Sequence, residues 1–537
     1  MRHALCLFFL LLMCGGFVLP VSAQESFDVV IRGGRVVDGS GNPWVQADVG
    51  VSGDRIHRVG DLTNAVGNVE IDATGLVVSP GFVDPHTHSR RGIFQVPTAD
   101  NVLLQGVTTV TEGNDGDSPL PIGAHLDRIR ETGISPNWAV FVGQGTIRSE
   151  VMGREDRDPT PRELDEMIAL VETAMKEGAL GLSTGLFYVP GAFTPTEEVI
   201  QLAASAAGYG GIYISHMREE ASGLLDSVRE TIRIGEEAGL PVQMTHHKAL
   251  GKHGWGFSRD SLALVDAARA RGVDITIDQY PYTASQTSIT ALFPAWAQEG
   301  TRQDMLERLR SPEMRRRLKT DIVWRIVNDR GGDDPGNVVI SLCAWDPTLE
   351  GQSLADILDR RGAEVTVDAA AELVMEIVER GGARAVYHAM QEDDVERIMQ
   401  HPATAIGSDG GISVFGHGVP HPREYGTFAR VLSRYVRERQ VLTLEDAVRK
   451  MSSATAQRIG LHNRGLLREG FMADIAVFDL DRVRDTATFQ DPHQYAVGIE
   501  YVLVNGVVVV DRGQHTGARP GHVLYGPGYE PADSADQ

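Results

Sequence analysis

Cysteine is scarce in this chain of 537 residues, which contains only Cys6, Cys14 and Cys343. Three thiols cannot build a disulfide framework, and a chain of this length buries enough apolar surface to fold without one. Basic residues are also in deficit, with 50 Lys and Arg against 73 Asp and Glu and a formal net charge of −23. Because nucleic-acid-binding proteins carry clustered basic faces, this balance argues against a nucleic-acid partner.

Long apolar runs are missing beyond the N-terminus. Residues 1–23 combine a basic start at Arg2, an apolar run from Ala4 to Met13 and the small-x-small ending VSA at 21–23. This order is typical of a cleaved secretory signal peptide, and the run is shorter than the about 20 residues of a membrane span. We therefore expect an exported protein, periplasmic or secreted, without a membrane span after cleavage. The alternative is an uncleaved anchor.

The residue pattern divides the remaining chain into a long central segment and two terminal segments that resemble each other. Residues 24–80 and 462–518 show alternating β-branched residues punctuated by Gly-Gly and Asp-Gly, which predicts hairpins of a small sheet. Between them, over 81–461, apolar strand-like runs alternate with amphipathic helical stretches. This alternation predicts an α/β fold with a parallel sheet, best a (β/α)8 TIM-like barrel. Residues 519–537 are rich in Gly, Pro, Asp and Ser and predict a flexible tail.

Four histidines and an aspartate follow strand-like runs. His86 and His88 end the run LVVSPGFVDPHTH, and positions i and i+2 of a strand face the same side, so both imidazoles can point at one ion. His216 follows GIYIS, His246 follows VQMT and Asp409 follows TAIGS. In a barrel such positions converge on the active site, and this donor set suits Zn²⁺. The HxH pair alone is equally consistent with two surface histidines. The similar positions of His216, His246 and Asp409 at strand ends favour a metal site.

Long motifs carry a resemblance to a known family. They are SPGFVDPHTH, NVLLQGVTTVTEGNDG, GALGLSTGLFYVPGAF, YISHMREE, THHKALG, IDQYPYTAS, AIGSDGG and HPREYGTF. On these motifs the chain resembles the amidohydrolase superfamily and, within it, the D-aminoacylase (N-acyl-D-amino-acid deacylase) family. The resemblance implies a barrel at 81–461 and a small β-sandwich domain built from 24–80 and 462–518. It also implies a helical flap over the barrel mouth at about 287–345.

The resemblance also implies a role for each candidate ligand. His216 and His246 match the histidines of a tightly held zinc, and His86 and His88 match the pair that holds a second metal, so one or two Zn²⁺ per chain are expected. Asp409 matches the catalytic aspartate, which takes up a proton and passes it to the leaving amine. In such a site the zinc activates the water and polarises the scissile carbonyl, and the nearby carboxylate transfers the proton.

One position departs from the family pattern. Relatives carry a cysteine ligand in Gly-Asn-Cys-Gly, whereas this chain has Asp115 within the matching stretch 113–116. A carboxylate binds or bridges zinc, and it is a harder ligand than a thiolate. Asp115 is therefore the expected fifth ligand. Two alternatives stay open, namely that Glu112 serves instead or that Asp115 only caps a turn, since Asn-Asp-Gly is good turn chemistry.

Four further residues are candidates for binding the substrate. By motif position, Lys248, Tyr280 and Arg423 match groups that hold the free carboxylate of an N-acyl amino acid, and Tyr188 matches the pocket wall. Arginine suits a planar carboxylate through paired donors, and lysine supplies a point charge. The alternative for each is a structural salt bridge or a packing role.

The resemblance implies a metal-dependent hydrolase that cuts the linear amide of a small N-acyl-D-amino acid and releases a carboxylate and a D-amino acid. The preference for the D-isomer comes only from the resemblance. One alternative is a cyclic-amide hydrolase or D-residue dipeptidase of the same superfamily, although relatives of that kind use a bridging lysine with no clear equivalent here. Another is a non-catalytic binding protein on a degenerate barrel, which the joint presence of the histidines and Asp409 disfavours.

Overall fold

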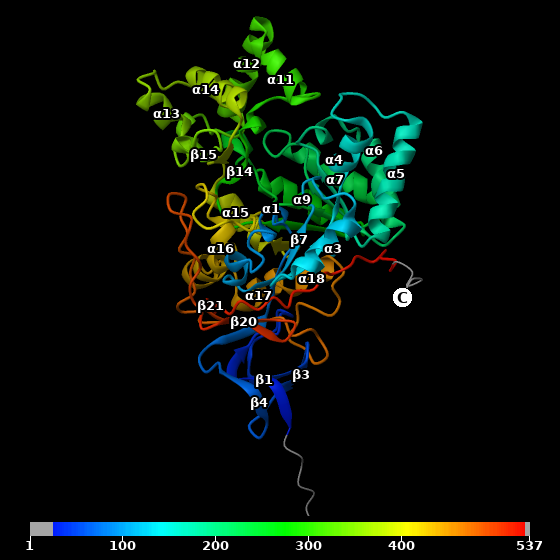
Figure 1. Cartoon of the computed structure of the whole chain (residues 1–537), viewed down its shortest axis with the longest axis vertical. Coiled ribbons are helices and arrows are strands. Elements are labelled where there is room, and N and C mark those ends of the chain that lie inside the picture. Colours follow the sequence, from blue (N-terminus) through cyan, green and yellow to red (C-terminus); the bar gives the residue numbers. More distant parts are fainter. Residues whose placement is uncertain (1–24, 532–537) are drawn as a thin grey trace, which may run out of the picture.

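The computed structural model describes residues 25–531, and the signal peptide predicted at 1–23 lies outside them. Over this range the molecule is elongated, with a small β domain at one end, an α/β body in the middle and an insertion at the other end (Figure 1). No helix of residues 25–531 combines the length and the apolar character that a membrane crossing requires.

Parallel strands form the centre of the body and are buried on both faces. All six residues of one of them, at 107–112, are buried, which is typical of a sheet covered by helices. The strands are β6 (Phe82–Asp84), β7 (Val107–Glu112), β8 (Asn137–Val140), β9 (Val142–Gly143), β10 (Gly181–Gly185), β11 (Ile212–His216), β12 (Val242–Met244), β13 (Ile275–Gln279) and β17 (Thr404–Ile406).

These strands close into a ring. Pairing runs from β6 through β7 to β8, and from β9 through β10, β11, β12 and β13 to β17, always in parallel. β8 and β9 are two parts of one strand interrupted at Phe141. A parallel bridge between Thr87 and Gly410 joins the ends of β6 and β17. Counting β8 and β9 as one, the ring has eight strands within residues 25–531. The predicted (β/α)8 barrel is thus confirmed.

Helices cover the outside of the ring, and their ends follow local chemistry. α5 (Pro161–Lys176) starts with a capping box in which Thr160 and Glu163 satisfy each other's backbone N–H groups, and it buries Met167 and Val171 on one face. The others are α1 (Arg90–Ile93), α2 (Asp100–Leu103), α3 (Ile122–Thr132), α4 (Gln144–Met152), η1 (Gly191–Phe193), α6 (Thr196–Ala207), α7 (Leu224–Ala238), α8 (Gly251–Gly254), α9 (Ser258–Ala270), α15 (Glu392–Gln400), α16 (Arg423–Arg430), η5 (Val431–Glu438), α17 (Leu444–Met451) and α18 (Ser453–Arg458).

Both ends of the chain build the small β domain, as the resemblance implies. Its strands are β1 (Ser26–Val36), β2 (Val45–Ser52), β3 (Arg55–Gly60), β4 (Val66–Asp72), β5 (Val77–Pro80), β18 (Ile475–Phe478), β19 (Ile499–Val504), β20 (Val507–Asp511) and β21 (Gln514–His515). The antiparallel pairing of β5 with β18 joins the two ends. Hydrogen bonds link all nine strands into one sheet over the described residues, and β1 pairs with β2, β4 and β5 along its length.

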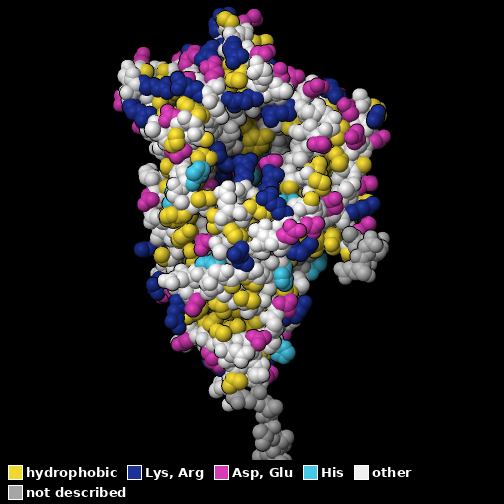
Figure 2. All heavy atoms as spheres, viewed as in Figure 1, with side chains coloured by type: hydrophobic (Ala, Val, Ile, Leu, Met, Phe, Trp, Pro, Cys, Tyr) yellow, Lys and Arg dark blue, Asp and Glu magenta, His cyan; other side chains and the backbone are white. Residues whose placement is uncertain are grey.

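An insertion follows β13 and stands over the barrel. It contains β14 (Ser285–Ser288), η2 (Ile289–Leu292), α10 (Ala295–Gln298), α11 (Arg302–Arg310), α12 (Pro312–Asn328), η3 (Pro335–Asn337), β15 (Val338–Leu342), η4 (Pro347–Leu349), α13 (Leu354–Arg360), α14 (Val367–Arg380) and β16 (Arg384–Tyr387). The predicted flap at about 287–345 covers only its first part, because the chain continues to β16, which pairs with both β14 and β15. Figure 2 shows a hollow between the insertion and the barrel in which Lys and Arg side chains gather.

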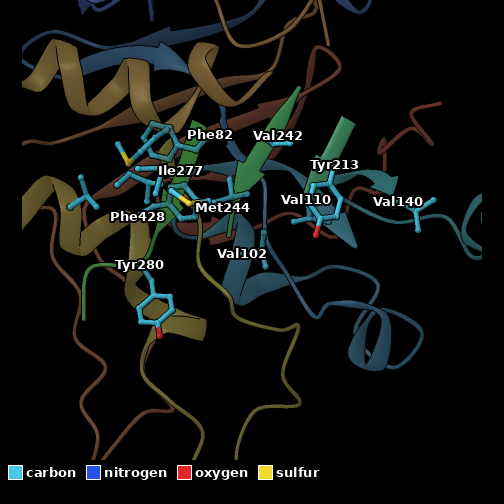
Figure 3. Close-up of a cluster of buried hydrophobic side chains, with 14 of the residues drawn as sticks. Phe82, Val102, Val110, Val140, Tyr213, Val242, Met244, Ile277, Tyr280 and Phe428 are labelled. Carbon is cyan, nitrogen blue, oxygen red and sulfur yellow. The ribbon is translucent and has the colours of Figure 1, made fainter. Parts of the chain in front are cut away.

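Separate apolar cores hold the barrel and the insertion. In the barrel, Phe82 stacks on Phe428 with ring centroids 5.7 Å apart, and Met244 and Ile277 lie beside them (Figure 3). The insertion has its own buried cluster, which includes Cys343. Because each part buries its own apolar side chains, the insertion is a separately packed unit that brings side chains to the barrel mouth.

Residues 519–531 differ from the flexible tail predicted at 519–537. Trp138 donates its backbone N–H to the carbonyl of His522 (2.9 Å), which fixes the segment beside β8. The Gly-rich composition wrongly suggested flexibility, because glycines of this segment pack closely against the barrel. A Cβ atom at Gly526 would lie 2.0 Å from a backbone oxygen of the barrel.

Candidate metal centre and active site

All five candidate ligands and the candidate catalytic residue lie at the carboxyl edge of the barrel. Because parallel strands end together at this edge, side chains far apart in the sequence meet there. The described residues that follow or end a strand in this way are His86 and His88 after β6, Asp115 after β7, His216 in β11, His246 after β12 and Asp409 after β17.

Asp115 lies at the centre of this group. Its Oδ1 atom is 3.4 Å from Nε2 of His86 and 3.4 Å from Nε2 of His246. Its Oδ2 atom is 3.5 Å from Nε2 of His88 and 3.6 Å from Nδ1 of His216. Among the described residues, two sets of donor atoms are therefore close enough to hold an ion. One contains His86, His88 and Asp409, the other contains His216 and His246, and Asp115 belongs to both.

The turn that presents Asp115 has little conformational freedom. Asp115 has a φ of 56°, a left-handed conformation that is costly for a residue with a side chain. Gly113, two residues earlier, has a φ of 82°, and a Cβ atom there would lie 2.1 Å from the carbonyl oxygen of Phe141. His246 and Asp409 also have positive φ, 35° and 50°. Strain concentrated at one edge is typical of a functional site.

The donor atoms fit a metal ion. Both ring nitrogens of His86 and of His216, and Oδ1 of Asp115, are buried without a hydrogen-bond partner among residues 25–531. A buried polar atom without a partner costs about 1–3 kcal/mol, so five of them in one place require an explanation. Imidazole nitrogens and carboxylate oxygens are ligands of Zn²⁺ and similar divalent ions. Three of the five predicted ligands, His86, Asp115 and His216, thus carry buried atoms that a bound metal would satisfy.

Glu112 is placed differently from Asp115. Its Oε2 atom accepts the backbone N–H of Arg90 at 2.8 Å, and it belongs to neither donor set. The structure therefore favours Asp115 over Glu112 as the residue that stands in for the family cysteine.

Asp409 lies between Arg423 and His88. Its Oδ2 atom lies 2.8 Å from Nη1 of Arg423, and its Oδ1 atom lies 3.1 Å from Nε2 of His88. Burial alone raises the pKa of the Asp409 carboxyl group, but the opposing charges, Arg423 foremost, outweigh it and hold the pKa below its ordinary range. Asp409 is thus a carboxylate at neutral pH.

Glu220 is a buried carboxylate that the sequence patterns did not single out. Its Oε1 atom is 2.5 Å from Nζ of Lys248 and 3.2 Å from Nδ1 of His246, and its Oε2 atom is 3.6 Å from Nε2 of His216. The only sequence signal was its position four residues after His216 in the motif YISHMREE. Lys248 therefore forms a buried ion pair, which is the structural alternative weighed for it.

Two buried aspartates support the histidines from behind. Asp278 accepts the backbone N–H of His246 at 2.6 Å and lies 3.7 Å from Nδ1 of His86. Asp84 accepts the backbone N–H of His86 at 3.2 Å, and burial raises the pKa of Asp84 to about 7. Supporting carboxylates of this kind orient metal-ligating histidines. Each stands in a motif of the resemblance, but their positions behind the ligands come only from the fold.

A cavity of about 610 Å³ opens over the centre. Tyr188, predicted as part of the pocket wall, lines it together with Lys248 and Tyr280, whereas Arg423 lies behind Asp409 with its guanidinium 4.8 Å from the Tyr280 ring centroid. The Tyr188 hydroxyl is 3.1 Å from the hydroxyl of Thr287 in the insertion. The Tyr280 hydroxyl is buried without a partner in the described residues, so it remains free to bind a ligand.

A (β/α)8 barrel with histidine and aspartate donors at its carboxyl edge and a cavity above them defines a metal-dependent hydrolase. Comparison with known proteins shows which protein family the chain belongs to. The chain belongs to the Amidohydrolase family, which it matches over residues 69–318 and 348–510.

Relatives of known name cover almost the whole chain. The chain is 37% identical to D-aminoacylase from Alcaligenes xylosoxydans xylosoxydans, over 94% of this chain and 98% of the relative. It is also 37% identical to N-acyl-D-glutamate deacylase from the same organism, over 93% of this chain and 97% of the relative.

Solved structures agree with the sequence relatives. A crystal structure of D-aminoacylase matches with a TM-score of 0.79 and 36% identity, over 93% of this chain and 100% of the other. N-acyl-D-glutamate deacylase from Bordetella bronchiseptica, complexed with zinc and a phosphonate mimic of the tetrahedral intermediate, matches with a TM-score of 0.79 and 35% identity, over 93% and 100%.

Proposed function

We propose that this chain is a zinc-dependent hydrolase that cleaves the linear amide bond of N-acyl-D-amino acids, releasing a carboxylate and a D-amino acid. The observation that carries the proposal is the donor cluster around Asp115 with Asp409 beside it, beneath a cavity of about 610 Å³. The preference for the D-isomer is supported by relatives named D-aminoacylase and N-acyl-D-glutamate deacylase.

The chemistry divides between the metal and this chain's own residues. The histidines and Asp115 would hold the zinc ion, which when bound would supply Lewis acidity toward the scissile carbonyl and the attacking water. Asp409 takes up the proton of the water at Oδ1, the oxygen that Arg423 does not hold, and returns it to the leaving nitrogen. Tyr280, with its free hydroxyl, orients the substrate in the cavity.

A bridging lysine, which cyclic-amide hydrolases of this superfamily use, has no counterpart in this arrangement. Lys248 is the lysine nearest to the donor cluster in the described part of the chain, and its Nζ atom is bound to Glu220 at 2.5 Å. This pairing supports linear-amide cleavage over ring opening.

A substrate panel tests the proposal. Purified protein of known zinc content is assayed with N-acetyl-D- and N-acetyl-L-amino acids, D-dipeptides and a cyclic amide, and a portion is stripped with a chelator and reloaded. We expect turnover of the N-acetyl-D-amino acids, its loss on stripping and its return with zinc. Turnover confined to the cyclic amide or the dipeptides, or no turnover with zinc bound, would contradict the proposal.

We also propose that the protein is exported and that residues 1–23 are removed. The basic, apolar and small-x-small order of that segment supports this. The intact mass of protein recovered from the periplasm or the medium is expected to begin at Gln24. Recovery from the cytoplasm alone with residues 1–23 still attached would contradict it.

A further inference from the structure

One buried carboxylate faces both histidines of a single donor set, on the side away from Asp115. His216 and His246 turn different ring nitrogens toward Asp115, Nδ1 of His216 at 3.6 Å and Nε2 of His246 at 3.4 Å. The remaining nitrogen of each ring faces Glu220. Its Oε1 atom is 3.2 Å from Nδ1 of His246, and its Oε2 atom is 3.6 Å from Nε2 of His216. Glu220 therefore has one oxygen beside each ring.

The backbone of Glu220 is fixed between the two loops that carry these histidines. His216 is the last residue of β11, and Glu220 follows it by four residues. The carbonyl oxygen of Glu220 accepts the backbone N–H of Leu250 at 2.8 Å, in the loop that continues from His246. Because β11 and β12 are adjacent parallel strands, this bond ties together the loops that follow them. The barrel thus sets the position of the carboxylate relative to both rings.

Two of the facing atoms have no hydrogen-bond partner. Oε2 of Glu220 and Nε2 of His216 are both buried and unpaired among residues 25–531. Arg330 of the insertion, whose Nη2 atom is 3.9 Å from Oε2, is too far away for a hydrogen bond. A neutral imidazole that gives one nitrogen to a metal carries its proton on the other. A metal at Nδ1 of His216 would therefore place an N–H group opposite Oε2 and satisfy both atoms.

Lys248 supplies the counter-charge that a buried carboxylate needs. Its Nζ atom is 2.5 Å from Oε1 of Glu220 and 2.7 Å from Nδ1 of His246. An ammonium group only donates hydrogen bonds, so it bonds Nδ1 only while that nitrogen carries no proton. When Nε2 of His246 binds a metal, Nδ1 carries the proton and Glu220 is the acceptor beside it. Lys248 then balances the charge of Glu220 and is not needed to orient the ring.

We propose that Glu220 is a positioning residue that holds the rings of His216 and His246 and thereby sets the affinity of the metal position which they share with Asp115. Loss of a carboxylate behind metal-ligating histidines lowers metal affinity about 10–100-fold. Within residues 25–531 Glu220 pairs with neither His86 nor His88, so the other donor set is independent of it. The inference rests on the metal centre of the proposed function and not on its substrate.

The alternative is that Glu220 only pairs with Lys248 and stabilises the fold, and four variants separate the two roles. Glu220→Gln keeps the size of the side chain and removes its charge. Glu220→Gln/Lys248→Met also removes the lysine that the first change leaves unpaired, and Lys248→Met removes the lysine alone. Glu219→Gln is the matched control, because that neighbouring carboxylate pairs with neither histidine in the described part of the chain.

Metal binding is measured without any substrate. Metal-free proteins are titrated with Zn²⁺ against a competing chelating dye, which gives the dissociation constant of each bound ion, and loading with Co²⁺ gives a visible spectrum that reports the geometry of the ligands. We expect Glu220→Gln and the double variant to raise the dissociation constant of one ion about 10–100-fold and to change the Co²⁺ spectrum. Lys248→Met and Glu219→Gln should match the wild type.

The same titration in a His88→Ala background assigns the affected ion. His88→Ala removes a ligand of the other donor set, so the ion that it retains is the one held by His216 and His246. Adding Glu220→Gln to this background should weaken that ion by the same factor. An unchanged dissociation constant there would overturn the proposal.

Stability and activity have separate readouts. The double variant lacks an unpaired buried charge, so it decides the question even if Glu220→Gln alone does not fold, and circular dichroism confirms the fold of each protein. A double variant that binds zinc as tightly as the wild type would show that Glu220 only balances Lys248 and would overturn the proposal. A wild type that binds zinc but cleaves no N-acyl-D-amino acid would contradict the proposed function and leave this inference intact.

Discussion

Arg423 Nη1 lies 2.8 Å from Oδ2 of Asp409, so the arginine expected to hold the substrate carboxylate holds the candidate catalytic carboxylate. This contact leaves Oδ1 of Asp409 facing the ligands, 3.1 Å from Nε2 of His88. The two oxygens of one side chain therefore have different surroundings, one anchored and one available for the proton. The relationship joins α16, which begins at Arg423, to the end of the last barrel strand.

Replacing Asp409 with asparagine removes the proton acceptor while preserving the shape of the side chain. We expect Asp409→Asn to lose about 10²–10⁴-fold in kcat, the range for a general acid–base group. Zinc bound by the remaining ligands is expected to stay, as measured by elemental analysis of the same sample. Near-normal turnover with full zinc content would remove Asp409 from the proton-transfer role.

Asp115 is shared by the two donor sets, so its loss is expected to affect both metals. Asp115→Ala should lose metal and activity together while its far-ultraviolet circular dichroism stays that of the wild type. Asp115→Cys restores the family pattern and should bind zinc again, because a thiolate is a good zinc ligand. Glu112→Gln is the matched control and should keep its metal. Full zinc content in Asp115→Ala would show that Asp115 only shapes the turn.

Local patterns predicted the parts of the fold that depend on neighbouring residues. The strand–helix alternation of 81–461 and the hairpin texture of 24–80 and 462–518 correspond to the barrel and the small β domain. The extent of the insertion was missed because β16 pairs with strands about 45 and 100 residues earlier, beyond any local window. The binding of 519–531 was missed because close-packed glycines have the composition of a loop.

At the metal site, too, features that depend on neighbouring residues could be predicted, whereas contacts between distant residues could not. His86 and His88 are separated by one residue after a strand, a spacing that predicts a shared direction from the sequence alone. Glu220 and Lys248 are 28 residues apart and meet only because adjacent barrel strands end side by side. Arg384 reaches the cavity from another part of the fold, and no motif marks it.

Removing one partner of the buried Glu220–Lys248 ion pair should lower the stability of the fold more than replacing both partners together. Glu220→Gln leaves the Lys248 ammonium buried without a counter-charge, and loss of one partner of such a pair costs about 3–5 kcal/mol. We therefore expect a clear fall in the thermal midpoint of Glu220→Gln and a partial recovery in the double variant Glu220→Gln/Lys248→Met. Unfolding of the single and double variants at equal zinc loading measures the coupling. A double variant less stable than Glu220→Gln would contradict this account.

His125 of α3, which belongs to neither donor set, should make stability depend on pH. It packs between the rings of Phe94 and Trp138, with centroids 5.9 Å away in each case, and its Nε2 atom has no partner within the described range. Burial, and then the charges of Arg90 and Arg128, lower the pKa of His125 from 6.5 to about 4.

The unfolded chain therefore binds a proton at His125 near pH 6.5, whereas the folded protein binds it only near pH 4. The stabilising effect of the neutral ring is complete above pH 6.5 and is lost as the pH falls toward 4. Between pH 7.5 and pH 5, His125→Phe should lose less stability than the wild type, by on the order of 1–2 kcal/mol after allowance for solvent screening. Urea unfolding at both pH values measures the difference, with the exposed His462→Phe as control. Equal losses in all three proteins would show that His125 is protonated as readily in the folded state as in the unfolded one.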